Sequence, residues 1–352
     1  MTDFSKQLIL WYQKQLRDLP WRVNQDPYRI WVSEVMLQQT TVVAVIPYFE
    51  KWMQCYPTLE DVAEASLEEV MKTWEGLGYY RRVKNLHKAA QIIQKEHGGK
   101  VPRTRESLHA LPGFGPYTIG AVLSIAFNQR EPIIDANVRR LVMRLLAIEG
   151  IADTKQDPQV YDYLEEVMPQ KNMRDFNQAL MEMGALVCRS QEPICLLCPI
   201  KNYCEGYAKG IQEIIPIPKK KKIHKFNAAI AVIRQSEKFL IQKRTKKGLL
   251  EGLWEFPGGK QEAGESIEDT LKREVREELE THLEESVFLL NVKHNYTQFS
   301  VTLYVYDCKV RETIVEHETR LWVSLEEMQK YPMPSGSARI VDYLLKEQEV
   351  IL

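Results

Sequence analysis

The sequence lacks any apolar run of the roughly 18–20 residues that a membrane-spanning helix needs. Its N-terminus carries Asp3 and Lys6 and does not follow the layout of a signal peptide. These absences argue against a secreted protein and against a helical membrane protein, and we expect a cytoplasmic location. The sequence also has no internal repeats. Its 44% hydrophobic and 27% charged residues are typical of folded soluble domains rather than of disordered chains.

A surplus of charge of either sign is also absent, because 47 Lys and Arg residues face 48 Asp and Glu residues. Over the whole chain, the net charge of −1 counts against a phosphate-rich partner. The two parts of the chain differ, however. Residues 1–225 contain 30 basic and 26 acidic residues, a net of +4, and residues 226–352 contain 17 and 22, a net of −5. The first part therefore keeps the sign of charge that a nucleic-acid partner favours.

The length of 352 residues fits two or three domains. Up to about residue 210, apolar residues recur at helical spacing. The clearest helical segments are Leu59–Trp74, Val83–Glu96 and Val160–Met168. Beyond residue 226, a helix at Ser266–Leu279 lies among short β-rich runs, which indicates an α+β domain. The predicted strands are Ala228–Ile233, Phe239–Gln242, Val287–Val292 and Val301–Tyr306. Between the two parts, Ile214–Lys222 is predicted to be an exposed tether, with a segment lying along a phosphate backbone as the alternative.

Cysteines are few, and a reducing cytoplasm makes them better metal ligands than disulfide partners. Of the six, Cys55 and Cys308 stand alone and are expected in the core. The other four form a cluster with the spacing Cys-x6-Cys-x2-Cys-x5-Cys, at Cys188, Cys195, Cys198 and Cys204. Four thiolates at this spacing predict a metal site, and the spacing alone allows zinc or an iron–sulfur cluster.

A carboxylate on an apolar helical face is the first chemical pattern in the sequence. Asp26-Pro27 is typical of a helix start, because Asp caps a helix and Pro suits its first position. Ile30, Glu34 and Leu37 then share one face of that helix. If the face is buried, desolvation raises the pKa of Glu34, as a general acid at neutral pH requires. The alternative is a rotated helix that leaves Glu34 in solvent.

A glycine-rich turn is the second pattern. Leu111-Pro-Gly-Phe-Gly-Pro-Tyr-Thr118 follows a helix and leads into the apolar helical stretch Ile119–Phe127, which predicts a helix-hairpin-helix. Gly113 and Gly115 permit tight backbone geometry and close approach by a ligand. Backbone N–H groups beside a helix N-terminus suit one DNA phosphate.

An aspartate follows in Ile133-Ile-Asp-Ala-Asn-Val-Arg-Arg140. The apolar residues before it indicate partial burial of Asp135 at a helix start, where Asp is favoured. Its role there would be that of an N-cap, or that of a carboxylate that stabilises a cation in a transition state.

Four sequence strings together closely resemble the MutY adenine DNA glycosylases, a family within the endonuclease III superfamily. They are Glu34-Val-Met-Leu-Gln-Gln-Thr40, Gly76-Leu-Gly-Tyr-Tyr-Arg81, Leu111-Pro-Gly-Phe-Gly-Pro-Tyr-Thr118 and Asp135-Ala-Asn137. The resemblance covers nearly the whole chain, and the first string is the most specific, because it separates this family from its thymine-glycol-removing relatives. It implies a DNA N-glycosylase of base excision repair. Such an enzyme would remove adenine mispaired with 8-oxoguanine, or with guanine, from double-stranded DNA.

The resemblance also implies roles for individual residues. Glu34 would protonate adenine so that the base can leave, and Asp135 would stabilise the oxocarbenium-like sugar or attack it transiently. Asn137 would support that carboxylate. Tyr117 matches the family's active-site tyrosine or serine, where bifunctional relatives carry lysine. Because no amine is available there for a Schiff base, we expect a monofunctional hydrolase without efficient strand cutting. Ala136 is a departure, since the family often has Gly there.

A base inside a duplex is out of reach, so the adenine must be flipped out. The family's residues that touch DNA or wedge beside the orphaned base match Gln39, Thr40, Leu77 and Tyr79. An aromatic ring on a flexible turn suits a wedge between base steps, and ordinary core packing is the alternative for Tyr79.

The four-cysteine spacing resembles the 4Fe-4S loop of the same superfamily. The resemblance therefore favours a 4Fe-4S cluster over zinc. We expect this cluster to shape a loop that presents basic side chains to phosphates rather than to act on the base. Those side chains are Arg189, Lys201 and Lys209.

The acidic C-terminal part contains Gly259-x5-Glu265-x7-Arg273-Glu274-Val275-x-Glu277-Glu278, which resembles the Nudix box of MutT-like pyrophosphohydrolases. Glu274, Glu277 and Glu278 share one helix face, and a hard cation such as Mg²⁺ would relieve their repulsion. Glu280 departs from the box, which has Gly there, and this change could alter the helix end. Two interpretations remain: a module that recognises 8-oxoguanine, or one that also binds Mg²⁺ and hydrolyses pyrophosphates.

The family's recognition loop for 8-oxoguanine matches His294-Asn-Tyr-Thr-Gln298. Tyr296 and Thr297 keep the family's character, and Gln298 replaces a histidine. Glutamine can still donate and accept hydrogen bonds, so the resemblance predicts contact of these three residues with the opposite base. A plain turn at a strand end is the alternative.

The predicted architecture is multi-domain, with an all-α helix-hairpin-helix glycosylase, a 4Fe-4S module and an α+β Nudix-like C-terminal domain. The predicted ranges are 1–22 for an N-terminal segment that packs with the iron–sulfur module, 23–130 for a six-helix barrel, 131–213 for the iron–sulfur module, 214–225 for a Pro/Lys linker and 226–352 for the Nudix-like domain. We expect a monomer associated with the nucleoid. One alternative is a Nudix pyrophosphohydrolase tethered to a DNA-binding module. The other is a mismatch-binding scaffold with a redox-sensing cluster, against which Glu34 and Asp135 together argue.

Overall fold

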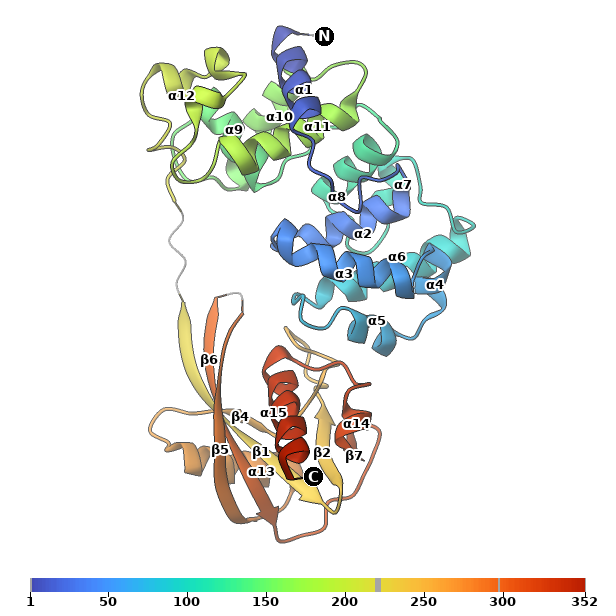
Figure 1. Ribbon diagram of the computed structural model, residues 1–352, viewed down its shortest axis with the longest axis vertical. Coiled ribbons are helices and arrows are strands. Elements are labelled where there is room, and N and C mark those ends of the chain that lie inside the picture. Colours follow the sequence, from blue (N-terminus) through green and yellow to red (C-terminus); the bar gives the residue numbers. More distant parts are fainter. Residues whose placement is uncertain (1, 219–222, 297, 352) are drawn as a thin grey trace. The chain divides into compact units, whose positions relative to one another are not determined.

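The computed structural model describes residues 2–218, 223–296 and 298–351. The chain divides into two compact units, Met1–Glu64 with Asn85–Lys220 and Ala65–Lys84 with Lys221–Leu352. The first unit is helical, and the second combines a mixed β-sheet with helices (Figure 1). This confirms the predicted combination of an all-α part and an α+β part. No helix in the described ranges is long and apolar enough to cross a membrane.

Short helices joined by short connections build the first unit. They are α1 (Asp3–Gln15), α2 (Pro27–Leu37), α3 (Val42–Cys55), α4 (Leu59–Glu64), α6 (Arg81–Glu96, which begins in the segment grouped with the second unit), α7 (Arg105–His109), α8 (Pro116–Ala121), α9 (Ala136–Leu145), α10 (Asp157–Val167), α11 (Met173–Glu182) and α12 (Glu205–Ala208). Two π-helical segments continue α8 and α11, at Val122–Ala126 and Met183–Val187.

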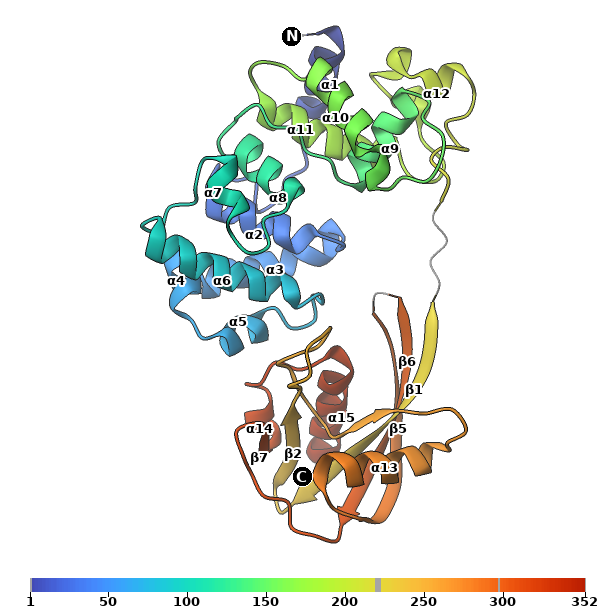
Figure 2. The ribbon, with the colours of Figure 1, turned by 180° about the vertical axis from the view of Figure 1, so that it is seen from behind.

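The N-terminal helix α1 packs with α9, α10 and α11, and Figures 1 and 2 show these four helices together. Their shared apolar core includes Leu8, Leu141, Leu164 and Phe176, all fully or almost fully buried. Three of the four clustered cysteines pack against this core, so the cysteine loop rests on the same helices that carry Asp135 at the start of α9.

Two local predictions were wrong, one made from periodicity and one from residue type. The segment Leu59–Trp74 is not one helix, because Ser66 begins a new helix, α5 (Leu67–Thr73), with a capping box that involves Glu69. An apolar spacing cannot reveal this break, whereas Ser followed by Glu three residues later can. Cys55 is exposed at the end of α3, beyond the buried face of that helix, although Cys308 is buried as expected.

The linker is anchored at its start. Ile215 is 2% exposed, and its carbonyl oxygen accepts a hydrogen bond from Arg144 Nε at 2.8 Å. The backbone N–H of Ile217 also donates to Gly150 O at 2.8 Å. The prediction of an exposed tether was therefore wrong for Ile215, whose side chain is buried, whereas the side chains of Ile214 and Ile217 are exposed. The lysine run at 219–222 lies outside the described residues.

A mixed sheet forms the centre of the second unit. Its strands are β1 (His224–Gln235), β2 (Lys238–Lys243), β3 (Trp254–Glu255), β4 (Gly258–Lys260), β5 (Leu283–Tyr296), β6 (Phe299–Val310) and β7 (Arg320–Val323). Their order is β3-β2-β1-β6-β5, with β4 paired to β1 and β7 paired to β2. Strands β1 and β6 run parallel, with Ile230 opposite Val305, and the other pairs are antiparallel. All four predicted strands are confirmed.

Helices cover both faces of this sheet (Figure 2). Ala231 of β1 packs with Val275 of α13 (Ile267–Leu279), and the next residue, Val232, packs with Ile340 of α15 (Ser335–Ile351). Successive residues of a strand point to opposite faces, so the two helices lie on opposite sides. A short helix α14 (Leu325–Met328) precedes α15. The predicted helix at Ser266–Leu279 is confirmed, with Ser266 as its N-cap.

Candidate active site

Glu34 lies on the buried face of α2. The helix begins as its sequence indicates, because Asp26 caps it by accepting a hydrogen bond from the Tyr28 N–H at 2.9 Å. Ile30 is 3% exposed and Glu34 is 5% exposed. The buried face is therefore confirmed, and the alternative of a rotated helix with Glu34 in solvent was wrong.

The carboxyl group of Glu34 is held by Tyr117, whose hydroxyl donates a hydrogen bond to Glu34 Oε2. Burial raises the pKa of Glu34 to about 7, although the Tyr117 hydrogen bond and the charge of Arg22 act in the opposite direction. The charge of Asp135 raises this pKa further. A substantial fraction of Glu34 is therefore protonated at neutral pH, which is the state that a general acid needs.

Asp135 is the N-cap of α9, as its position in the sequence predicts. Its Oδ1 accepts a hydrogen bond from the Val138 N–H at 2.7 Å, and its Oδ2 accepts one from Asn137 Nδ2 at 2.9 Å. Burial raises the pKa of Asp135, and these hydrogen bonds oppose the rise. The two donors fix the orientation of the carboxyl group at the helix start.

One cavity of about 650 Å³ brings these residues together. Its wall includes Glu34, Tyr117, Asp135 and Asn137, so the four predicted catalytic residues line the same space. Thr40, one of the predicted DNA contacts, lines it as well. A carboxyl group that is partly protonated and a second carboxyl group at a helix start therefore line one open cavity large enough for a small organic group.

The same cavity contains a charged group that the sequence interpretation missed. Glu182 is 2% exposed, and its Oε1 accepts hydrogen bonds from Arg17 Nη2 at 2.8 Å and from Arg22 Nη2 at 2.6 Å. Its buried Oε2 has no hydrogen-bond partner among the described residues. The available signal was that Glu182 is the only charged residue in the apolar stretch Ala179–Val187.

Hydrogen bonds connect the active site to the cysteine loop through Arg140. Its Nη2 donates to Asn137 Oδ1 at 3.0 Å and to Gly184 O at 2.6 Å. Its Nε donates to the backbone oxygen of Cys188 at 2.9 Å. The side chain that supports Asp135 is thus linked, through one guanidinium, to the first of the clustered cysteines.

The four clustered cysteines line one small cavity together with Arg144. Arg144 is 1% exposed, and its Nη1 donates to Cys188 Sγ at 3.3 Å. Burial raises the pKa values of the Cys195, Cys198 and Cys204 thiols, so free thiolates there would be costly without a cation. In the described part of the chain, no group of three or more His, Cys, Asp or Glu side chains is placed to hold a single metal ion.

The predicted hairpin lies between α7 and α8, which confirms a helix-hairpin-helix. Gly113 has φ +81°, and a Cβ there would come within 2.9 Å of the Asn85 Cβ, so this position requires glycine. Gly115 caps α8, and the space where its Cβ would point is open to 4 Å. Gln39, in the turn after α2, is exposed and has the left-handed φ of 59°.

The Gly76–Tyr79 turn belongs to the second unit. Tyr79 is half-buried and has φ 51°, which is rare for an aromatic residue. The guanidinium of Arg82 lies over the rings of Trp74 and Tyr79, 5.2 Å from each centroid. Leu77 is only 6% exposed, so it packs inside the protein in this conformation, and its contact with DNA stays a prediction.

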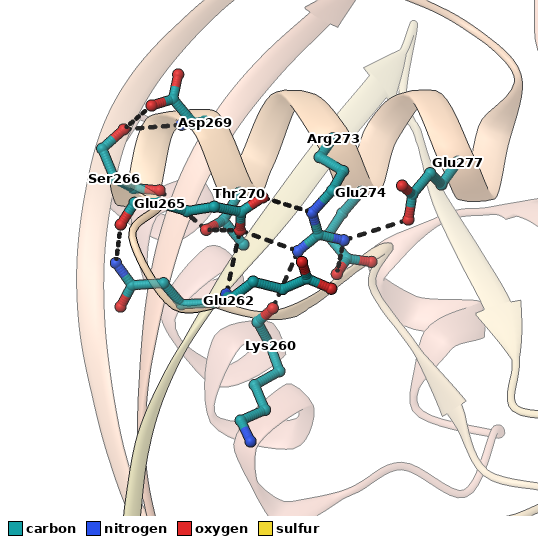
Figure 3. Close-up of polar contacts among 10 residues, drawn as sticks. Lys260, Glu262, Glu265, Ser266, Asp269, Thr270, Arg273, Glu274 and Glu277 are labelled. Atoms are coloured by element: carbon teal, nitrogen blue, oxygen red, sulfur yellow. Dashed lines mark hydrogen bonds and ion pairs between the residues drawn. The ribbon is translucent and has the colours of Figure 1, made fainter.

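The acidic face of α13 is organised by Arg273 (Figure 3). Arg273 pairs with Glu265 through two hydrogen bonds of 2.7 and 3.1 Å, and its Nη1 also donates to Glu274 at 2.8 Å and to Glu277 at 3.2 Å. Glu278 lies apart from this set, with its Oε2 accepting from the Gly258 N–H at 2.9 Å. Each of these carboxylates is therefore already satisfied by a donor from the protein.

This arrangement does not fit a bound Mg²⁺. The box glutamates are engaged by Arg273 and by backbone, and burial raises the pKa of Glu278. The described residues contain no acidic group placed to hold a metal ion, and we derive no step through Mg²⁺. The pyrophosphohydrolase interpretation stays a prediction. The change to Glu280 does not alter the helix end, because Glu280 adopts the left-handed φ of 56° at some backbone cost, about 1 kcal/mol.

The predicted recognition loop lies at the turn between β5 and β6. Gln298 is exposed, and its backbone oxygen accepts a hydrogen bond from the His224 N–H at 2.8 Å. Thr297 and the side chain of Tyr296 lie outside what the structure describes. Contact of these three residues with a base stays a prediction.

Comparisons with known proteins agree with this fold. A family model described as "HhH-GPD superfamily base excision DNA repair protein" matches residues 32–170, and one described as "NUDIX domain" matches residues 228–343. A thermostable thymine-DNA glycosylase of known structure has a TM-score of 0.53 and 29% identity, over 58% of this chain and 95% of its own. A trapped endonuclease III–DNA covalent intermediate has a TM-score of 0.50 at 24% identity, over 59% of this chain and 95% of its own, and shows the same fold. The fold and the site thus define a helix-hairpin-helix DNA glycosylase of base excision repair that carries a NUDIX domain.

Curated relatives identify the particular family within this class. The adenine DNA glycosylase of Buchnera aphidicola subsp. Acyrthosiphon pisum is 32% identical over 97% of this chain and 98% of its own length. That of Schizosaccharomyces pombe is 33% identical over 94% and 87%, and that of Homo sapiens is 35% identical over 87% and 67%. The chain belongs to the adenine DNA glycosylase family, and it is a DNA-binding N-glycosylase.

Proposed function

We propose that this enzyme removes adenine paired with 8-oxoguanine, and more weakly adenine paired with guanine, by hydrolysis of the N-glycosidic bond without efficient strand cutting. The observation that carries this proposal is the single cavity lined by both Glu34, with a pKa of about 7, and Asp135. A glycosidic bond breaks when the leaving base is protonated and the cationic sugar is stabilised, and these two groups supply both functions.

In the proposed mechanism, the flipped adenine enters this cavity. Glu34, held by Tyr117, donates a proton to the base, which then leaves as a neutral molecule. Asp135, oriented by the Val138 N–H and by Asn137, stabilises the positive charge that develops on the sugar. A water molecule completes the hydrolysis at the sugar carbon.

Tyr117 supports the absence of an efficient lyase step. Its phenol donates to Glu34, and burial raises its pKa well above the usual value. A phenol cannot form a Schiff base with the sugar, which strand cutting by this family's bifunctional relatives requires. Strand cleavage at the abasic product should therefore be negligible without added base.

The substrate preference rests on Gln298. Its exposed amide at the β5–β6 turn can donate and accept hydrogen bonds with a base edge, which supports a role in recognising 8-oxoguanine. We expect Gln298→Ala to reduce the ratio of adenine-release rates between A·8-oxoguanine and A·guanine duplexes by about tenfold, as the loss of one or two hydrogen bonds implies. Single-turnover kinetics on both duplexes measure this ratio.

The parent enzyme provides the test of the proposal itself. Adenine release should be faster from A·8-oxoguanine than from A·guanine, and absent from A·T. Equal rates on the three duplexes would contradict the proposed specificity. An unchanged ratio in Gln298→Ala, with the parent preference intact, would leave the preference in place but remove Gln298 from it.

We further propose that Cys188, Cys195, Cys198 and Cys204 hold a 4Fe-4S cluster. Each cysteine of such a cluster binds a different iron, so the thiols stand around a cavity rather than converge on one point, as zinc would need. The four thiols line one cavity, and the resemblance of their spacing to the 4Fe-4S loop of the superfamily supports the cluster over zinc. When bound, the cluster would cross-link the loop on which Arg189 and Lys201 are presented.

Metal analysis and thermal unfolding test this cofactor. The purified protein is expected to contain about four irons per chain and to show the visible absorption of an iron–sulfur centre. Cys198→Ser should lower the iron content and the unfolding temperature, whereas Cys55→Ser, a change at an exposed cysteine outside the loop, should alter neither. Stoichiometric zinc without iron would contradict the proposal.

A further inference from the structure

The Gly76–Tyr79 turn adopts an unusual backbone. Gly76, Gly78 and Tyr79 have φ values of 95°, 74° and 51°, all in the left-handed region. For Tyr79 this conformation costs about 1–2 kcal/mol. Such a residue keeps its conformation only where the surrounding structure determines it.

Some of the contacts that fix the conformation of Tyr79 lie within the segment itself. Arg82 Nη2 donates to Leu77 O at 3.2 Å and to Gly78 O at 3.1 Å, and Trp74 Nε1 donates to Gly78 O at 3.0 Å. The guanidinium of Arg82 also stacks on the Tyr79 ring. These contacts hold the carbonyl groups of the turn, but they do not attach the turn to the rest of the second unit.

The attachment is made by the residues on either side of the turn. Glu75, just before it, accepts a hydrogen bond from the Met333 N–H at 2.8 Å. Tyr80, just after it, donates from its hydroxyl to Met333 O at 3.1 Å. Lys72 adds a third contact, because its Nζ donates to Glu75 at 2.9 Å and to Tyr331 O at 3.1 Å.

These contacts are well placed to be rigid. Tyr80 is 4% exposed and Met333 is 2% exposed, so water does not compete for the Tyr80 hydrogen bond. The segment that receives them is itself fixed on the sheet, because Pro332 O accepts from the Trp254 N–H of β3 at 2.9 Å. Trp254 then donates from Nε1 to Glu68 of α5 at 2.6 Å.

We propose that Glu75 and Tyr80 are positioning residues that hold the Gly76–Tyr79 turn on Met333. As a result, Tyr79 and the predicted recognition loop at the β5–β6 turn meet DNA as parts of one rigid body. This inference rests on the proposed function in one respect: its kinetic test measures the preference for 8-oxoguanine over guanine opposite the adenine. The hydrogen bonds at Met333 themselves are independent of that function. They make the conformation of Tyr79 depend on a segment more than 250 residues away in the chain.

Hydrogen exchange on the free protein tests the attachment. In the double variant Glu75→Ala/Tyr80→Phe, amides of residues 76–82 should exchange about tenfold faster or more, as the loss of two hydrogen bonds implies. Glu75→Gln keeps an acceptor oxygen and should retain the protection of the parent. Tyr28→Phe is the matched control, since it removes a buried tyrosine hydroxyl bond of 2.8 Å to Tyr56 O in the other unit.

Single-turnover adenine release from A·8-oxoguanine and A·guanine duplexes tests the consequence. The double variant should lose about tenfold in the ratio of the two rates, while Glu75→Gln and Tyr28→Phe keep the parent ratio. Unchanged exchange in residues 76–82 would overturn the proposal, and so would faster exchange with an unchanged ratio. A parent enzyme without preference between the duplexes would instead overturn the proposed function, and the exchange result would then decide by itself whether Glu75 and Tyr80 hold the turn.

Discussion

Replacing Glu34 with glutamine is expected to lower the single-turnover rate of adenine release by about 10²–10⁴-fold, the range that a general acid contributes. Glutamine keeps the size of the side chain and can still accept the hydrogen bond from Tyr117, but it has no proton to donate to the base. The comparison needs equal concentrations of folded enzyme and an adenine·8-oxoguanine duplex. A variant that released adenine at the parent rate would rule out Glu34 as the acid.

The same variant should be more stable than the parent at alkaline pH. Burial raises the pKa of Glu34 from 4.5 to about 7, so the folded parent must ionise a buried carboxyl group above pH 7. The stability that the proton provides is complete below pH 4.5 and is lost as the pH rises through 7. At about 1.4 kcal/mol per pKa unit, the parent loses about 3 kcal/mol across this window. Glu34→Gln does not titrate, and denaturant unfolding on both sides of pH 7 measures the difference.

The pH dependence of the adenine-release rate in Tyr117→Phe tests the assignment of Glu34 as the acid. The hydrogen bond from Tyr117 lowers the pKa of Glu34, so its removal should raise that pKa. Glu34 acts in its protonated form, and the fall in rate with rising pH should therefore move to higher pH in this variant. A fall that moved to lower pH would contradict the assignment of this limb to Glu34.

Replacing Asp135 with asparagine is expected to lower adenine release by about 10²–10³-fold, the cost of removing a group that stabilises charge in a transition state. The helix cap should survive, because asparagine is as good an N-cap as aspartate and can still accept from the Val138 N–H. Its amide nitrogen would then face the donor Asn137 Nδ2, so we expect the free energy of unfolding to fall by about 1–2 kcal/mol, far less than the loss in rate. Rate and stability are therefore expected to separate in this variant.

Asp153→Asn is the matched control for this change. Asp153 is also an N-cap in the first unit, where it accepts a hydrogen bond from the Lys155 N–H at 2.9 Å, but it does not line the active-site cavity. Its replacement should leave the rate of adenine release at the parent value. Equal losses in both variants would show that the helix cap, and not the charge facing the cavity, accounts for the effect of Asp135→Asn.

Local patterns predicted where the candidate site residues lie within their own helices. The position of Glu34 on the same helix face as Ile30 followed from their spacing, and the N-cap role of Asp135 followed from the residue type at a helix start. Both depend on contacts within a few residues of the chain, which spacing and side-chain chemistry determine. The short hairpin with Gly113 is local in the same sense.

Contacts between distant residues could not be predicted in this way. The position of Glu182 between Arg17 and Arg22 requires α11 to pack beside the N-terminal segment, 160 residues away in the chain. Cys55 seemed a core residue from its type alone, yet the turn of α3 on which it lies faces solvent. Neither outcome has a signature in a short window of sequence.

The sequence by itself determined the family, the helix-hairpin-helix and the capping position of Asp135, because each depends on residue types at short spacing. Only the tertiary structure decided that Glu34 and Asp135 share one cavity, and that burial there raises the pKa of Glu34 to about 7. It also decided that Glu75 and Tyr80, on either side of the turn carrying Tyr79, form hydrogen bonds with Met333. Desolvation and long-range hydrogen bonds depend on which surfaces meet in the folded chain, and residue spacing does not contain that information.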